Sequence, residues 1–335
     1  MATIPARNAI PKVECMDKQP PNKKDAILHL ARVSLGDKRR RTPAHIALLI
    51  GVPAIVIALL VWWIYPKPAL PALLLAAFDQ VALPDEVVPL QARVEPVVTP
   101  ETPTDLTGCQ LFFLDMSSGR LLGKVSSGRD GWGAIETKNS AASSPYEMLV
   151  RFPGEENRRR SDQSGSQLYV WPAESSILVV DADRILAGVD DVNLWTQHNL
   201  DIRPRADAAA SLRSNQVSYR IVYLAVSAAS PSRYNKLRGW MGYVRASSTE
   251  AFPPGPLLAP AALPQIDDDF HKLIVGSLTK RFTGKLVGCT DDAIRAKLFH
   301  DSGLRSFLLS KTAESAEGIE VVKTWKELAE KLAKK

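Results

Sequence analysis

An unbroken apolar run of twenty residues, Ile46 to Tyr65 (IALLIGVPAIVIALLVWWIY), constrains this chain more than any other feature. About twenty apolar residues is the length that a helix needs to cross the hydrocarbon core of a membrane. Pro53 is tolerated within such a span, and Trp62 and Trp63 are the aromatic residues expected at a membrane interface. The run is long for a signal peptide and lacks a small-residue cleavage site. The sequence therefore predicts one transmembrane helix over residues 46–65.

The distribution of charge predicts how this helix is oriented. Basic residues occupy positions 38–41 directly before the run, whereas only Lys67 follows it closely. The positive-inside rule then places the N-terminus in the cytoplasm and everything after Pro66 outside it, in a periplasm or at the cell exterior. The net charge of +6 arises entirely before residue 46, where ten Lys and Arg face four Asp and Glu. Such a juxtamembrane excess suits anionic lipid headgroups, so nucleic-acid binding is excluded as a function class.

The segment before the run, residues 1–45, has too little apolar content to fold alone and is predicted to be a disordered cytoplasmic tail. The three cysteines are Cys15, Cys109 and Cys289, one in each region of the chain. This spacing excludes a disulfide framework and a zinc cluster. A bridge between Cys109 and Cys289 stays open at this point, beside the alternative that both are small buried thiols.

After the membrane segment the pattern changes to short alternating strands separated by Pro, Gly and Ser. Six apolar runs between Ala69 and Gly154 suggest a β-sandwich over residues 69–157, with hairpin signals at Ser118-Gly119 and Asp130-Gly131. The pattern resembles the immunoglobulin-like modules of exported bacterial proteins, which implies a spacer or binding platform without an active site. The polar stretch Glu155–Gln167 is interpreted as a linker or exposed loop.

The stretch SSILVVDADRILAG, residues 175–188, is the first one that carries chemistry. A β-branched strand delivers Asp181 and Asp183 two residues apart at its end, so both carboxylates point to one side. This motif resembles the first motif of the haloacid-dehalogenase-like superfamily. The resemblance implies that Asp181 is a nucleophile on phosphorus and that Asp183 is the general acid and base.

Five further blocks resemble those of lipin-type phosphatidate phosphatases and follow in the same order: residues 221–224, 238–241, 252–257, the helix 270–282, and 288–292. The resemblance covers residues 168–335 and implies a haloacid-dehalogenase-like domain. Its fold class is a doubly wound α/β sheet of the Rossmannoid kind, which the alternation of apolar strands and helical periods indicates independently. Ligands of such sheets bind beyond the carboxyl ends of the strands.

The resemblance also implies a set of site residues. The cofactor would be Mg²⁺, held by the carboxylates of Asp181, Asp183, Asp291 and Asp292. The phosphate would be bound by Ser227, Lys272 and Arg184.

Several positions depart from the family pattern. Arg184 and Ile185 replace the usual Gly and Thr, and Ala225 stands where a Ser or Thr is expected. An ungapped alignment places His271, rather than Lys272, at the position of the usual cation. Asp291 has an alternative role as a helix N-cap.

Two functions follow. The first is a membrane-anchored, magnesium-dependent phosphatase that acts on phosphatidate or another phosphomonoester. The second is a catalytically degenerate pseudo-phosphatase that serves as a binding or envelope-associated module, with an unknown protein partner. Arg184 is the residue that discriminates between the two functions, and a direct ion pair of Arg184 with Asp181 and Asp183 would favour the pseudo-enzyme.

Overall fold

The computed structural model describes residues 52–57, 60, 72–97, 105–138, 144–154, 161–247, 251–263, 269–313 and 317–334. The chain forms two compact units, Met1–Lys67 and Pro68–Lys335. The predicted tail and Cys15 lie outside the described residues, and of the predicted span only residues 52–57 and 60 are described, all helical. Among the described residues, no helix combines the length and the apolar character that a membrane crossing requires.

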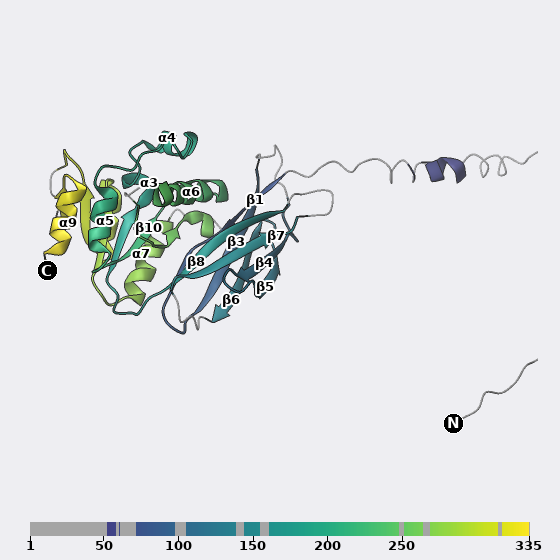
Figure 1. The fold of residues 1–335 in the computed structure, drawn as a ribbon, viewed down its shortest axis with the longest axis horizontal. Helices are drawn as coiled ribbons and strands as arrows, with labels where there is room; N and C mark the ends of the chain where they lie inside the picture. Colours follow the sequence, from purple (N-terminus) through teal and green to yellow (C-terminus); the bar gives the residue numbers. More distant parts are fainter. Residues whose placement is uncertain are drawn as a thin grey trace, which may run out of the picture. The chain divides into compact units, whose positions relative to one another are not determined.

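The second unit begins with a β-sandwich of two sheets (Figure 1). One sheet has the order β1-β3-β6 and the other the order β2-β8-β7-β4-β5. The strands are β1 (Leu73–Ala77), β2 (Gln80–Ala82), β3 (Val87–Pro96), β4 (Gln110–Asp115), β5 (Leu121–Ser126), β6 (Trp132–Lys138), β7 (Tyr146–Phe152) and β8 (Asp162–Val170).

Period-two alternation explains how the two sheets of the sandwich bury their inner faces. In β3 the buried residues Val88, Leu90, Ala92 and Val94 alternate with more exposed ones. They share one hydrophobic core with buried residues of β4, β7 and β8 from the other sheet. Alternating strands of this kind were predicted from the sequence, and each of the six predicted apolar runs contains at least one strand.

Two details of the sandwich differ from the sequence-based expectation. Residues 162–167 were interpreted as linker but belong to β8, which pairs with β7 and extends the sandwich to Val170. Asp130-Gly131 was predicted as a hairpin turn, yet β6 pairs with β3 in the opposite sheet rather than with β5. The prediction failed because a turn signal shows where the chain reverses but not which strand pairs next.

The rest of the unit is a six-stranded sheet in the order β11-β10-β9-β12-β13-β14, in which every described pair is parallel. In chain order this is 3-2-1-4-5-6, the doubly wound order, so the predicted fold class is confirmed for this part. The strands are β9 (Ile177–Asp181), β10 (Arg220–Leu224), β11 (Leu257–Leu258), β12 (Leu286–Thr290), β13 (Arg305–Leu309) and β14 (Ile319–Val322).

Helices cover both faces of this sheet, because its central strand is apolar on both sides. The helices are α3 (Ala182–Ile185), α4 (Asp191–Thr196), α5 (Ala208–Asn215), α6 (Pro231–Ser247), α7 (Phe270–Arg281), α8 (Ala293–Asp301) and α9 (Trp325–Ala333), with a 3-10 turn η1 (Pro260–Ala262). In β9, Leu178 and Val180 belong to the core formed with α5, α6 and α9. Ile177 and Val179 belong to the core formed with α7 and α8.

The sandwich and the α/β sheet are joined by polar contacts that converge on Asp79, which is 4% exposed. Its carboxylate accepts hydrogen bonds from the backbone N–H groups of Gln167 and Leu257, at 2.9 and 3.1 Å. The guanidinium of Arg238 on α6 lies 3.3 Å away, and the Tyr234 hydroxyl accepts from the Asp79 N–H at 3.1 Å. Neighbouring parts of both lobes are therefore fixed to one buried carboxylate.

The sequence left open a disulfide between Cys109 and Cys289, and the structure shows none between them. Cys109 lies in the sandwich core and Cys289 in the α/β core, both are buried, and no bridge joins them. Burial also raises the pKa of the Cys289 thiol.

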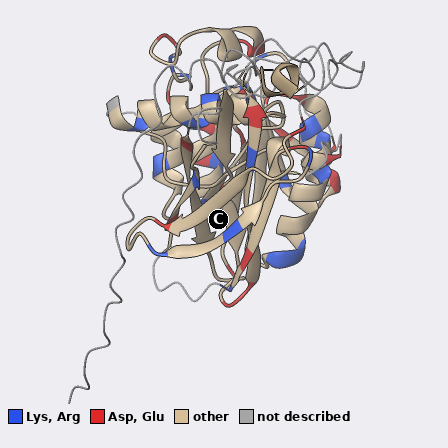
Figure 2. Ribbon diagram, turned by 90° about the vertical axis from the view of Figure 1, so that its right-hand side faces the viewer, with Lys and Arg blue, Asp and Glu red and all other residues tan. Residues whose placement is uncertain are grey.

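Figure 2 shows Lys and Arg interspersed with Asp and Glu over the described part, rather than separated by sign in that view.

Candidate functional site

Four of the predicted site residues, Asp181, Asp183, Ser227 and Asp291, lie at the carboxyl edge of the parallel sheet, where strand order reverses between β9 and β12. Asp181 is the last residue of β9, and Asp183 follows in α3. Ser227 comes three residues after the end of β10, and Asp291 comes directly after β12. This edge is where a doubly wound sheet binds ligands, so the topology brings these side chains together as expected.

Asp181 is held by an arginine that the sequence analysis did not single out. A single guanidinium nitrogen of Arg295, on α8, lies 2.8 Å from each carboxylate oxygen of Asp181. The Thr290 hydroxyl donates to Oδ2 at 2.6 Å. The Asp181 side chain is 0% exposed and that of Arg295 is 20% exposed. Both oxygens of the predicted nucleophile are thus engaged within the protein.

Asp183 is almost as deeply buried, at 2% exposure, and contacts the loop after β10. Its Oδ2 accepts hydrogen bonds from the backbone N–H of Ser227, at 2.6 Å, and from the Ser227 hydroxyl. The same Arg295 nitrogen is 3.8 Å from Oδ1 of Asp183, too far for a hydrogen bond. Ser227 therefore lies at the site, but its hydroxyl is used on a carboxylate rather than being directed at a phosphate.

The electrostatics of the site favour the protonated form of Asp181. Burial raises the pKa of Asp181 well above its usual value of 3.8, and the neighbouring Asp183 raises it further, while Arg295 opposes both effects. Oδ1 of Asp183 is buried and has no hydrogen-bond partner among the described residues. A proton on Asp181 would remove one of two neighbouring buried negative charges, which are costly together.

Asp291 is also neutralised by arginines. Its Oδ1 accepts from Nε of Arg184 at 3.1 Å, and its Oδ2 accepts from Nη2 of Arg205 at 3.0 Å. Arg184 makes a second ion pair with Asp191 on α4, at 3.0 Å. The predicted phosphate-binding Arg184 therefore faces Asp291 and Asp191, and no contact with Asp181 or Asp183 occurs for it in the described structure.

The remaining predicted residues have other roles. Oδ1 of Asp292 caps α8 by accepting from the N–H groups of Ile294 and Arg295, at 2.8 and 3.1 Å. The cap role that the sequence suggested for Asp291 thus belongs to Asp292. Lys272 is exposed on α7, where it lines a separate surface cavity with Lys280.

His271, next to Lys272, is buried instead and packs edge-on against the Phe299 ring, with centroids 4.8 Å apart. Burial, followed by the charge of Arg295, lowers the pKa of His271 to about 4, although Asp183 and Asp292 oppose the shift. The imidazole is therefore neutral at physiological pH and supplies no cation to the site.

This arrangement does not fit Mg²⁺, which prefers an octahedron of oxygen ligands. Asp181 and Asp291 have their oxygens engaged by guanidinium or hydroxyl groups, and an oxygen of Asp292 caps a helix. No group of three or more His, Cys, Asp or Glu within the described ranges could hold a metal ion. A cation here would also lie beside the Arg295 guanidinium, which repels it.

Comparisons with known proteins add only distant likenesses. No protein-family model matches the chain, and a search of curated proteins found no match. A HAD-like phosphatase structure from Mesorhizobium loti is 15% identical, with a TM-score of 0.36, and covers 58% of this chain and 94% of its own.

Two other structures resemble a smaller part of the chain. The first immunoglobulin domain of Dpr1, solved bound to DIP-eta, is 11% identical at a TM-score of 0.24 and covers 31% of this chain and 100% of its own. The PKD domain of human KIAA0319 is 19% identical at 0.21 and covers 33% and 91%. Likenesses at these scores carry no weight for function, so the site is interpreted from its own geometry.

The sequence analysis missed the three residues that define the electrostatics of the site: Arg295, Arg205 and Thr290. For Arg295 a signal was present. It stands in the first turn of a helix that follows a strand and two aspartates, so its side chain starts at the carboxyl edge of the sheet. No such signal existed for Arg205, which lies in an irregular loop and reaches Asp291 from 86 residues away.

Proposed function

We propose that the α/β domain is a phosphatase-like domain that has lost catalysis and serves as a binding or envelope-associated module. The observation that carries this proposal is the contact of Arg295 with both oxygens of Asp181, whose side chain is 0% exposed. A carboxylate can attack phosphorus only if one of its oxygens is free and accessible. Here a guanidinium supplies the positive charge that a metal would otherwise bring, and it does so from within the fold.

The contacts of Asp291 support the same conclusion independently. Arg184 and Arg205 bind its two oxygens from different segments of the chain. Each of these pairs is partly buried, with the Asp291 side chain 20% exposed. Arg295, Arg184 and Arg205 thus supply positive charge to these aspartates in place of a metal ion, so the proposed module needs no cofactor.

The proposal also includes the location of the module. The apolar run at residues 46–65 and the basic residues before it support a single membrane anchor with the N-terminus in the cytoplasm. The sandwich and the α/β domain would then be extracytoplasmic, held close to a membrane face. A protease-protection assay on sealed vesicles tests this: an epitope on the C-terminus should be digested in right-side-out vesicles, whereas protection of the epitope would refute the orientation.

An active phosphatase is the second candidate, and one observation favours it. Asp181, Asp183 and Ser227 do meet at the carboxyl edge of the sheet, as phosphoryl transfer through an aspartyl nucleophile would require. This candidate needs Arg295 to leave Asp181 when a phosphomonoester enters. Its substrate would be phosphatidate or a related lipid, given the proposed anchor.

One assay separates the two candidates. Full-length protein in a mild detergent is incubated with p-nitrophenyl phosphate and with short-chain phosphatidate, with and without Mg²⁺, and phosphate release is measured. Asp181→Asn is the test variant, and Asp201→Asn makes the same change at an exposed carboxylate of the same domain. We expect no release above the protein-free blank for any of the three proteins.

Magnesium-dependent release by the wild type and by Asp201→Asn that disappears in Asp181→Asn would overturn the pseudo-phosphatase proposal. A second readout does not depend on activity. The melting temperature should be unchanged by millimolar Mg²⁺ or by a chelator, because the arginines already neutralise the carboxylates.

A further inference from the structure

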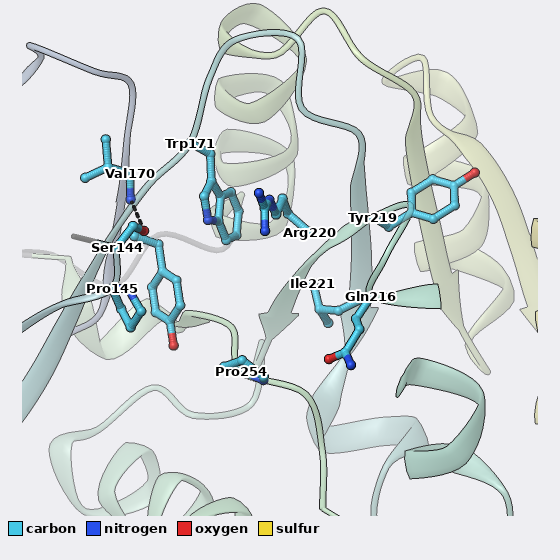
Figure 3. A pocket seen from close by; sticks show the side chains of 10 residues that line it. Ser144, Pro145, Val170, Trp171, Gln216, Tyr219, Arg220, Ile221 and Pro254 are labelled. Carbon is cyan, nitrogen blue, oxygen red and sulfur yellow. Dashed lines mark hydrogen bonds between the residues drawn. The ribbon is translucent and has the colours of Figure 1, made fainter. Parts of the chain in front are cut away.

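A cavity of about 320 Å³ lies between the sandwich and the α/β sheet, at the amino end of β10. Trp171 and Tyr169 line it from the end of β8, while Arg220 and Gln216 line it from the α/β side (Figure 3). Asp181 and Asp183 lie at the opposite, carboxyl edge of the same sheet. The cavity is therefore separate from the site of Asp181, Asp183 and Asp291 with their arginines, which we call the arginine-filled cluster. Its volume is within the range of small-molecule sites, roughly 300–1,000 Å³.

Arg220 gives the cavity a positive charge. It is the first residue of β10, and its backbone N–H donates to the Ser176 carbonyl at 2.8 Å, which fixes where the side chain starts. The side chain is exposed, and its guanidinium has no hydrogen-bond or ion-pair partner in the described part of the chain. A planar guanidinium with free donors matches a carboxylate through two parallel hydrogen bonds.

The side of the cavity formed by the sandwich carries aromatic side chains. Trp171 is 5% exposed, and its ring packs between those of Tyr169 and Phe282, with centroid distances of 5.6 and 6.3 Å. The ring is thus held in place, while its indole N–H has no hydrogen-bond partner among the described residues. Pro145 continues the apolar lining on this side, and Ile221 of β10 adds an apolar residue beside Arg220.

Neutral donors complete the lining of the cavity. Gln216 is exposed at the end of α5, and no hydrogen bond of its side-chain amide is present among the described residues. Together with the indole N–H of Trp171 it offers neutral hydrogen bonds next to the one cation. Such a combination orients a polar ring whose charged group is already fixed by the guanidinium.

We propose that this cavity is a binding site for a small molecule that bears a carboxylate on a ring. The carboxylate would pair with Arg220, and the ring would lie against Trp171 and Pro145 and accept a hydrogen bond from the indole N–H. Two sources supply this chemistry, a sugar acid and an aromatic acid. The inference goes beyond the proposed function and does not rest on it, since the cavity shares no residue with the carboxylate cluster.

The test is isothermal titration calorimetry on the full-length protein in detergent, with glucuronate and benzoate as probes. Glucose and benzyl alcohol are the matched rings without a carboxylate, and acetate is the carboxylate without a ring. We expect saturable binding of at least one ring acid and none of its uncharged counterpart. Arg220→Gln should weaken this binding about 10-fold or more, as expected for a charge-assisted hydrogen bond. Trp171→Phe, which keeps a ring but removes the N–H, should weaken it less.

Arg129→Gln is the matched control, because it makes the same charge change at an exposed site on the sandwich, away from the cavity lining. It should bind like the wild type, and all three variants should keep the wild-type melting temperature within a few degrees. Binding of glucuronate alone identifies a sugar acid and binding of benzoate alone an aromatic acid. The proposal is overturned if neither acid binds, if glucose or benzyl alcohol binds as well as its acid, or if Arg220→Gln leaves the affinity unchanged.

Discussion

Removal of Arg295 is the perturbation that tests the arginine-filled cluster most directly. Arg295→Met keeps much of the side-chain volume but removes the guanidinium that lies 2.8 Å from both oxygens of Asp181. Breaking a buried ion pair by deleting one partner typically costs about 3–5 kcal/mol, because the other charge stays buried and unpaired. For a domain of this size, that corresponds to a fall in melting temperature of roughly 6–20 °C.

The loss should depend on pH in a defined direction. Burial raises the pKa of Asp181 above its usual value of 3.8, so the folded protein retains a proton that the unfolded chain releases. The stability contributed by this proton is complete below about pH 4 and is lost as the pH rises through the folded pKa. Without Arg295 the pKa rises further, since the cation that opposed the shift is gone. The deficit of Arg295→Met should thus be larger at pH 8 than at pH 5.

Thermal unfolding of the full-length proteins, followed by tryptophan fluorescence at both pH values, measures this deficit. The double variant Asp181→Asn/Arg295→Met removes both charges and should regain most of the lost stability at pH 8. Arg203→Met, an exposed arginine without a side-chain contact in the described structure, should change stability by no more than about 0.5 kcal/mol. The reasoning is refuted if Arg295→Met melts with the wild type at pH 8, or if the double variant is no more stable than the single one.

Three further variants test other parts of the structure. Asp79→Ala should lower the melting temperature and speed proteolytic cleavage between the lobes, because it removes the ion-pair partner of the half-buried Arg238 and the acceptor of two backbone N–H groups; unchanged proteolysis would contradict this. Burial lowers the pKa of His271 to about 4, so between pH 6.5 and pH 4 the unfolded chain takes up a proton that the folded state does not. His271→Phe should therefore reduce the loss of folding free energy over this pH range by up to about 3 kcal/mol. Acid unfolding curves that are equal for the two proteins would contradict this. Gly288→Ala should destabilise the protein by about 1–3 kcal/mol in equilibrium unfolding, because the added Cβ would lie 2.4 Å from the buried ring of Phe299; a neutral effect would show that the ring can move.

Local pattern predicted most of the fold. The continuous apolar run ILVVD is set by burial on both faces and the helical period of residues 270–282 by burial on one face, and both patterns are visible in the sequence. The strands that were missed explain the limits of this approach. β8 reads as polar because residues 162–167 carry Asp, Gln, Ser and Gly, and only pairing with β7 makes it a strand. β11 has two residues, too few for any period to emerge.

The site was predicted in position but not in chemistry. The spacing of Asp181 and Asp183 and the topology of the sheet place them at the carboxyl edge without knowledge of any other residue. What the two carboxylates do depends on which cations reach them, and these come from far along the chain. Arg295 reaches Asp181 across 114 residues.

The identity of the neutralising group decides between a phosphatase and a pseudo-phosphatase. A metal ion can accept a phosphoryl oxygen while it holds carboxylates, because it has coordination positions to share. A guanidinium offers hydrogen-bond donors only in its own plane. Nη1 of Arg295 already donates to both carboxylate oxygens of Asp181. On the proposal made above, the same positive charge therefore has opposite consequences, since magnesium would leave a position for a phosphoryl oxygen whereas Arg295 engages both oxygens of Asp181. The open cavity beside Arg220 is then one place where the described structure leaves a cation available to a ligand.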